Sequence, residues 1–227
     1  CGKDGTVWII YLQTGTNNLI AAYSTNSGVD WTNTTVVALG AGDSGGACCV
    51  DNNGNILCIY SRNASTVVEY KKYTISTGTW GTAETVYTYV GAATIWFSIC
   101  IDSKNDPYVS YHFNGGSTYY SYRKNSVWSS AIALNLSLTP SITCDRNDII
   151  YVSSGALIQR YTDFGTVQDT AFVNPIALLG GGYFYFATFP KWDTYTYLTY
   201  FTNPHMPVGM EEVNDRLCLG NGDRAGS

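Results

Sequence analysis

The chain has 227 residues, of which 13% are charged and 15% aromatic, and its formal net charge is −5. Because nucleic-acid binding requires a basic surface, this acidic balance argues against a nucleic-acid partner. No apolar run approaches the roughly 20 residues of a helical membrane span, so none is predicted. The 19 tyrosines and 23 glycines are typical of β-strands joined by tight turns.

One sequence pattern recurs along the chain in step with its cysteines. Residues 49–60 read Cys-Val-Asp-Asn-Asn-Gly-Asn-Ile-Leu-Cys-Ile-Tyr, and related segments begin at Cys1, Cys100 and Cys144. The intervals between these starts are 48, 51 and 44 residues. A self-similar period of this length predicts a repeat architecture.

Each repeat contains short apolar runs bounded by Gly, Asn, Asp or Ser, which is the pattern of β-strands. We expect strands at residues 7–11, 19–23 and 35–39, then 47–50, 56–60, 67–73 and 84–90, then 93–100, 108–112, 118–123 and 131–136, then 149–152 and 157–161, and finally 183–187 and 195–200. The sequence therefore predicts an all-β fold, a β-propeller of four or five four-stranded blades over residues 1–202. Residues 203–227 lack the pattern and are predicted to be a non-repetitive C-terminal tail or docking segment.

The cysteines do not have the spacing of a disulfide framework or of a zinc site. Four of the seven fall in one repeat column, where we expect them to act as small buried apolar residues. A chain that begins Cys1-Gly2 also fits a mature bacterial lipoprotein, although the repeat column already accounts for Cys1. No cofactor is predicted.

Residues 24–31 read Ser-Thr-Asn-Ser-Gly-Val-Asp-Trp. This segment resembles the Asp-box turn, Ser-X-Asp-X-Gly-X-X-Trp, of sialidase-like β-propellers, with Asn in place of the Asp. The resemblance covers roughly residues 1–200 and implies a turn between the third and fourth strands of each blade, with the Trp packed between blades. In that family the turn lies opposite the active site, so it implies a fold and no activity. The residues assigned to these turns are Asn26, Gly28 and Trp31, Gly78 and Trp80, Trp128, and Asp163 and Gly165.

Sialidases of this family use three arginines, a Tyr-Glu nucleophile pair and an acidic Asp, because an anionic sugar needs converging cations. The six arginines of this chain cannot be assigned to those three positions. Glu69 and Tyr70 are adjacent in one strand and so point to opposite faces. A divergent sialidase-like glycoside hydrolase, using carboxylates such as Glu84 or Asp193, is the alternative to a non-catalytic protein.

Two other motifs are better explained as connections between strands. Residues 42–46, Gly-Asp-Ser-Gly-Gly, match the nucleophile segment of trypsin-like proteases, but both histidines, His112 and His205, follow this serine instead of preceding it. Residues 51–55 begin like a calcium-binding loop, yet Arg62 stands where the bidentate Glu is required. We therefore predict turns stabilised by Asp side chains, and no metal site.

Ligands of the related propellers meet the loops that join second to third strands and fourth to next-first strands. In this chain those loops carry Arg62, Asn63, Tyr89, Trp96, His112 and Asn114. We predict a non-catalytic recognition or assembly module that binds a glycan or partner protein subunits, with no catalytic residue assigned. The low charge and the Gly, Asn, Thr and Tyr-rich repeats resemble propeller modules of phage tail and fibre proteins. An extracellular or virion-surface location is expected, and an oligomer is compatible with this role.

Overall fold

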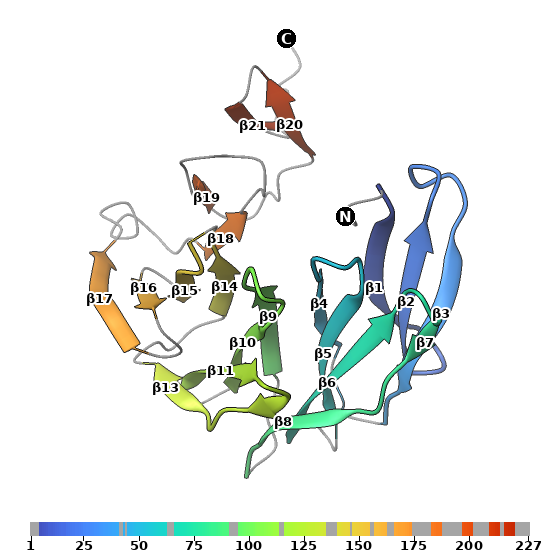
Figure 1. Ribbon diagram of the computed structural model, residues 1–227, viewed down its shortest axis with the longest axis horizontal. Helices are drawn as coiled ribbons and strands as arrows, with labels where there is room; N and C mark the ends of the chain where they lie inside the picture. The colour runs from blue at the N-terminus through green and yellow to red at the C-terminus, as the bar shows by residue number, and fades with distance from the viewer. Residues whose placement is uncertain are drawn as a thin grey trace.

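The computed structural model consists of antiparallel β-sheets set around a common axis as the blades of a propeller (Figure 1). This architecture confirms the predicted all-β propeller fold. No helix of the described part of the chain is long and apolar enough to cross a membrane. The structure describes residues 5–40, 43, 45–62, 66–90, 95–113, 116–134, 140–145, 147–154, 157–162, 166–173, 183–187, 197–201, 209–213 and 216–220.

Four sheets make up blades 1 to 4, each with its strands in sequence order. Blade 1 contains β1 (Val7–Gln13), β2 (Asn18–Ser24) and β3 (Thr32–Ala38). Blade 2 contains β4 (Ala47–Val50), β5 (Ile56–Arg62), β6 (Val67–Thr74), β7 (Thr79–Trp80) and β8 (Glu84–Thr88). Blade 3 contains β9 (Ile95–Ile101), β10 (Pro107–Phe113), β11 (Thr118–Lys124), β12 (Val127–Trp128) and β13 (Ile132–Leu134). Blade 4 contains β14 (Pro140–Cys144), β15 (Ile150–Ser154), β16 (Leu157–Thr162) and β17 (Thr166–Val173).

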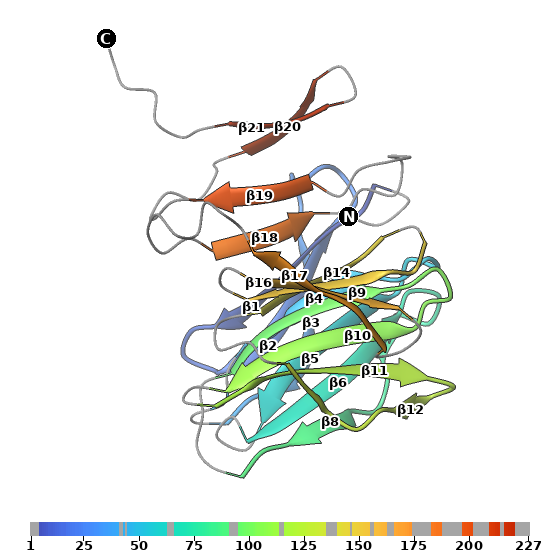
Figure 2. The same cartoon turned by 90° about the vertical axis from the view of Figure 1, so that its left-hand side faces the viewer.

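Two hairpins follow blade 4, and Figure 2 shows them stacked beyond the blades. The first joins β18 (Tyr183–Ala187) to β19 (Tyr197–Phe201), and the second joins β20 (Gly209–Val213) to β21 (Arg216–Gly220). Sequence analysis did not predict β14, β17 or the second hairpin, which lies in the segment expected to be a tail.

The antiparallel order gives every blade two distinct ends. First strands turn into second strands, and third strands into fourth strands, at one end, which we call the turn face. Second strands lead to third strands, and fourth strands to the next blade, at the opposite end, which we call the loop face. The chain thus places its short Asp-containing and Asn-containing turns on the turn face and its predicted ligand-binding loops on the loop face.

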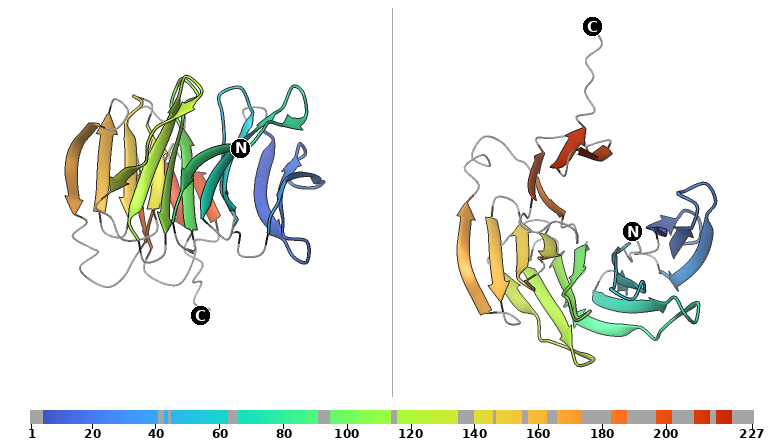
Figure 3. Two further views of the ribbon diagram at one scale, coloured as in Figure 1. Left: turned by 90° about the horizontal axis from the view of Figure 1, so that it is seen from below. Right: turned by 45° about the horizontal axis from the view of Figure 1, so that its top comes forward.

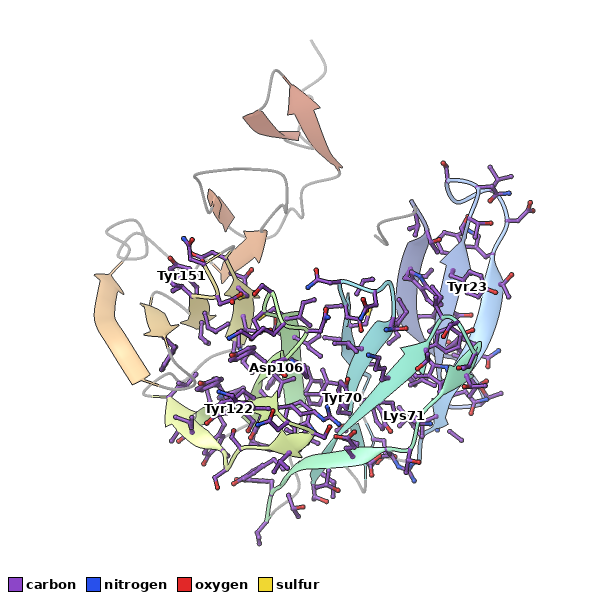
Figure 4. All side chains as sticks on the ribbon, in the orientation of Figure 1. Tyr23, Tyr70, Lys71, Asp106, Tyr122 and Tyr151 are labelled. Atoms are coloured by element: carbon purple, nitrogen blue, oxygen red, sulfur yellow. The ribbon has the colours of Figure 1, made fainter. Side chains whose placement is uncertain are left out.

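The hydrophobic core lies between blades, because successive side chains of a strand point to opposite faces. In β5, Cys58 and Tyr60 pack against Leu19 and Ala21 of blade 1. The intervening residues of β5, Leu57 and Ile59, pack on the other side against Val109 and Tyr111 of blade 3. A third cluster joins blade 3 to blade 4 through Tyr108, Tyr120, Ile150 and Val152. Figure 4 shows the same alternation in β6, where Tyr70 points toward blade 3 and Lys71 toward blade 1.

The five cysteines whose side chains the structure describes are free thiols at Cys48, Cys49, Cys58, Cys100 and Cys144. Cys58 is fully buried, and burial raises the pKa of its thiol well above the ordinary value. A thiol in this environment stays protonated and behaves as a small apolar side chain.

Asp side chains organise the turns between first and second strands. Asp51 Oδ1 accepts hydrogen bonds from the backbone N–H groups of Asn53 and Asn55 at 2.9 and 2.8 Å. Asp102 and Asp145 bind their own turns in the same way. Burial favours a raised pKa for Asp51, but hydrogen bonds from Lys72 and Asn55 outweigh it and lower that pKa. The Asp51 carboxylate is therefore ionised and hydrogen-bonded within its own turn.

Successive turns are also bonded to one another across the turn face. The backbone N–H of Asn52 donates to Asn105 Oδ1 at 2.6 Å, which joins blade 2 to blade 3. The Ser103 N–H donates to Asp148 Oδ1 at 2.7 Å, which joins blade 3 to blade 4. These contacts fix the spacing of the blades at this end of the molecule.

The turn at residues 24–31 connects β2 to β3, the third and fourth strands of the blade pattern. Ser24 Oγ accepts a hydrogen bond from the Gly28 N–H at 2.8 Å, and Asn26 Oδ1 accepts one from the Asp30 N–H at 2.9 Å. Gly28 has a φ of 88°, a conformation that favours glycine. Asn26 therefore serves as the acceptor at the position where the motif has an Asp.

Two of the three tryptophans assigned to these turns contact the preceding blade. Trp80 Nε1 donates to Thr34 Oγ1 on β3 at 3.2 Å, and Trp128 Nε1 donates to Glu84 Oε2 on β8 at 3.1 Å. Trp31 differs, because its indole N–H donates to the Gly28 carbonyl of its own turn and its ring is exposed. The Asp163 and Gly165 positions lie outside the described residues.

An ion pair between blades 2 and 3 gives a test of this packing. Arg123 donates from Nε and Nη2 to the two carboxylate oxygens of Glu84, at 2.7 and 2.8 Å, and lies over the Tyr70 ring. Lysine cannot reproduce this two-pronged contact. We expect Arg123→Lys to lower the free energy of unfolding by about 1–3 kcal/mol, measured by urea denaturation.

The matched control is Val127→Ala, at an exposed neighbour of Trp128 that should change little. Equal effects of the two substitutions would show that the ion pair contributes nothing to the association of the blades.

Candidate ligand-binding face

The residues predicted from the loops lie at the loop face but do not form one cluster. Arg62 faces the space between blades 1 and 2, Tyr89 the space between blades 2 and 3, and Trp96 with His112 the space between blades 3 and 4. Asn63 and Asn114 lie outside the described residues. The structure therefore divides the predicted site into three separate positions.

Between blades 1 and 2, a buried carboxylate already partners Arg62. Asp43 Oδ2 lies 3.9 Å from Arg62 Nε and also accepts a hydrogen bond from the Gly40 N–H. Asp43 belongs to the Gly-rich connection that matches a protease motif, and here it stabilises that connection. An anionic ligand would have to compete with Asp43 for the guanidinium group.

A Tyr-Glu pair occurs deeper in the same space. Tyr60 of β5 and Glu69 of β6 are direct partners across the two strands. Burial, followed by the negative charge of Glu69, raises the pKa of Tyr60. The Tyr60 side chain is fully buried, so no substrate reaches it, and its raised pKa is the opposite of what an activated tyrosine nucleophile needs. Tyr70, the sequence neighbour of Glu69, packs on the other face against blade 3.

Between blades 2 and 3, aromatic side chains fill the space up to the loop face. Tyr89 stacks on Phe113 with ring centroids 4.2 Å apart and an interplanar angle of 11°. Tyr87, Tyr111 and Tyr119 continue this cluster below them. Because the Tyr89 ring is already stacked on Phe113, packing between the blades accounts for the presence of an aromatic residue at this position.

Between blades 3 and 4, Trp96 and His112 form a pair at the loop end of the innermost strand. They are direct partners across β9 and β10, and their ring centroids lie 5.7 Å apart. His112 Nδ1 is 3.0 Å from Thr118 Oγ1, which holds the imidazole from the next strand. His112 is buried, whereas 38% of the Trp96 side chain is exposed. The result is an indole ring presented to solvent on a rigid support.

The pair itself and the described innermost strands carry no charge at neutral pH. Burial lowers the pKa of His112, so its imidazole carries no charge at neutral pH. The innermost strands β4, β9 and β14 contain no Asp, Glu, Lys or Arg. Such surroundings suit an uncharged ligand better than an anionic one.

The described residues offer little for catalysis or metal binding. Both oxygens of Glu84 are engaged by Arg123, and Asp193 lies outside the described residues. Within the described ranges, no group of three or more His, Cys, Asp or Glu side chains could hold a metal ion.

Sequence reasoning missed two residues that define these positions, Asp43 and Thr118. Asp43 was considered only as part of the protease motif. Thr118 lies opposite His112 in the register of β10 and β11. Pairing the two predicted strands through the intervening turn would have identified this contact.

Comparison with known proteins places the chain by its fold alone. No protein-family model matches the sequence, and no curated protein matches it. The chain is similar to a structure of unknown function from Dyadobacter fermentans, with a TM-score of 0.53, 14% identity, and coverage of 82% of this chain and 66% of that one. It is also similar to an ulvan lyase of polysaccharide lyase family PL25 (TM-score 0.49, 13% identity, coverage 76% and 57%). A third similar structure is the intramolecular trans-sialidase of Ruminococcus gnavus (TM-score 0.49, 12% identity, coverage 68% and 39%).

At identities of 12–14%, these similarities concern the fold and no particular activity. The chain spans 66% of the Dyadobacter protein's length and 57% of the ulvan lyase's length.

The lowered pKa of His112 predicts a pH dependence of stability. A histidine that is harder to protonate when folded stabilises the fold above its unfolded pKa of about 6.5, and this contribution is lost as pH falls through the folded pKa. We expect the free energy of unfolding of the wild type to fall more steeply below about pH 6.5 than that of His112→Gln, which retains a polar group for Thr118. Denaturation series between neutral and acidic pH measure this difference. Parallel curves for the two proteins would contradict the prediction.

Proposed function

We propose that this chain is a non-catalytic recognition module that binds a neutral sugar of a glycan at its loop face. The observation that carries this proposal is the Trp96 indole, which is partly exposed and is fixed against the buried His112. Aromatic rings bind the apolar faces of sugars and lose little conformational entropy on binding. Because the Trp96 ring is already held in place by His112, it loses even less conformational entropy when a sugar binds.

The residues around the site support recognition over chemistry. A glycosidase needs two carboxyl groups at a defined separation around the scissile bond. Arg62 pairs with Asp43, and the carboxylate of Glu84 is bound by Arg123. The hydrogen bonding of the 24–31 turn supports a sialidase-like origin of the repeats without the sialidase catalytic set.

The wider setting of the protein is part of the proposal. Low charge together with Gly, Asn, Thr and Tyr-rich repeats supports an extracellular or virion-surface appendage, in which partner protein subunits and an oligomer are expected.

A broad glycan array probed with the purified full chain tests the site. We expect binding to glycans with uncharged terminal sugars and about tenfold weaker binding by Trp96→Ala, because a lost aromatic contact costs about 1.4 kcal/mol. Trp96→Phe should retain part of the affinity. Val127→Ala, an exposed apolar residue on the turn face, is the matched control.

Arg62→Ala distinguishes neutral from anionic recognition. Because Arg62 lies between other blades and is paired with Asp43, its removal should leave binding unchanged. Binding that survives Trp96→Ala but is lost in Arg62→Ala would contradict the proposed site. Release of free sugar from a bound glycan would instead support a divergent glycoside hydrolase.

A further inference from the structure

One face of blade 1 has the composition of an interface but lies uncovered. Ile9 in β1 occupies the repeat position held by Cys58 in β5 and Val109 in β10. Cys58 and Val109 are fully buried against the preceding blade, whereas 45% of the Ile9 side chain is exposed. The same repeat position in blade 4, Val152, is also fully buried. Among the four described blades, this position is exposed only in blade 1.

The next position on this face shows the same contrast. Tyr11 corresponds to Tyr60 in blade 2 and to Tyr111 in blade 3. Tyr60 and Tyr111 are fully buried, and 37% of the Tyr11 side chain is exposed. On the other face of β1, Trp8 and Ile10 pack toward blade 2, and Leu12 near the end of the strand is 44% exposed. The side where a preceding blade would lie carries two exposed apolar residues at positions that are buried in blades 2 and 3.

The tryptophan in the turn of blade 1 is also exposed where its equivalents in blades 2 and 3 contact a preceding blade. Trp80 and Trp128 each donate a hydrogen bond to the outer strand of the preceding blade. Trp31, in the corresponding turn, is 41% exposed. Ile9, Tyr11 and Trp31 thus define an apolar surface, which we call the closure face. All three residues have equivalents at interfaces in blades 2 and 3, and the equivalent of Ile9 in blade 4, Val152, is also buried.

The chain supplies a segment at the position that would cover this face. The innermost strands of blades 2, 3 and 4 begin at residues 47, 95 and 140, and β18 begins at residue 183, one further repeat along. Each innermost strand contacts the next around the axis, and β18 continues the series by contacting β14. Strands β19, β20 and β21 then follow in the order of a second, third and fourth strand.

The chemistry and the placement of this segment also fit. Strand β18 reads Tyr-Phe-Tyr-Phe-Ala and β19 reads Tyr-Leu-Thr-Tyr-Phe, a composition that suits burial between apolar faces. Figures 1 and 3 show the ring open on one side, with blade 1 and the C-terminal hairpins bordering that same opening.

We propose that strands β18, β19, β20 and β21 form a fifth blade that packs on the closure face of its own chain and closes the ring. This arrangement removes the uncovered apolar surface and leaves each blade between two others, as ring closure in a propeller requires. The segment expected to be a tail is then partly structural, since β20 and β21 belong to the fifth blade.

Site-specific photocrosslinking tests the proposal on the full chain. A benzophenone side chain placed at position 9 should crosslink, after irradiation, to peptides of residues 183–220 within a monomer. The same group at the exposed position 127, on the outer part of blade 3, should not reach that segment. Crosslinks that join two chains would show that a second copy covers the face, and would overturn the proposal. Equal yields at the two positions would also overturn it.

Hydrogen exchange gives an independent measurement. Ile9→Asp introduces a charge into the closure face and should increase amide exchange in residues 183–187 and 197–201, while β5 and β10 keep their protection. Val127→Asp is the control for an added charge. If Ile9→Asp leaves exchange in the 183–220 segment unchanged, that segment does not pack on the closure face.

Discussion

Each blade of this protein has two apolar faces, and a single β-sheet cannot bury either of them by itself. The burial must come from neighbouring blades, so the three described hydrophobic clusters all lie between sheets. Strand β5 illustrates the constraint, because its alternate residues belong to two different clusters. Almost every residue of such a strand is fixed by packing, which explains why both faces of the strand are apolar and why the period-2 alternation of half-exposed sheets is weak here.

Polar contacts then determine how the blades are oriented around the axis. The Trp80 and Trp128 indoles, and the Arg123 guanidinium, reach the outer strand of the preceding blade. The turns at the other edge of each blade are joined by backbone-to-side-chain hydrogen bonds such as Ser103 to Asp148. Buried apolar surface supplies most of the stability, but it is non-directional. These few directional bonds specify one angle between neighbouring blades.

The repeat made the fold predictable, and the same feature limited the prediction of the site. Cys and Asp recur at equivalent positions of the repeats because each blade packs against its neighbours in the same way. The positions of most strands could therefore be predicted from the sequence. Arg62, Tyr89 and His112 lie at the same end of the blades, but sequence position alone did not show that they face three different spaces. That assignment depends on strand parity, since Phe113 and His112 are adjacent yet point to opposite sides of blade 3. The β20–β21 hairpin was missed because its Gly-rich and acidic segment lacks the repeat pattern.

The two ends of the blades therefore differ in how freely they can change. On the turn face, the Asp51, Asp102 and Asp145 carboxylates each bind backbone N–H groups, and replacing one would leave those donors without a partner. On the loop face, the residues of the connections differ from blade to blade. A scaffold with one face fixed and the other variable can present a single exposed aromatic ring, such as Trp96, without disturbing the packing beneath it.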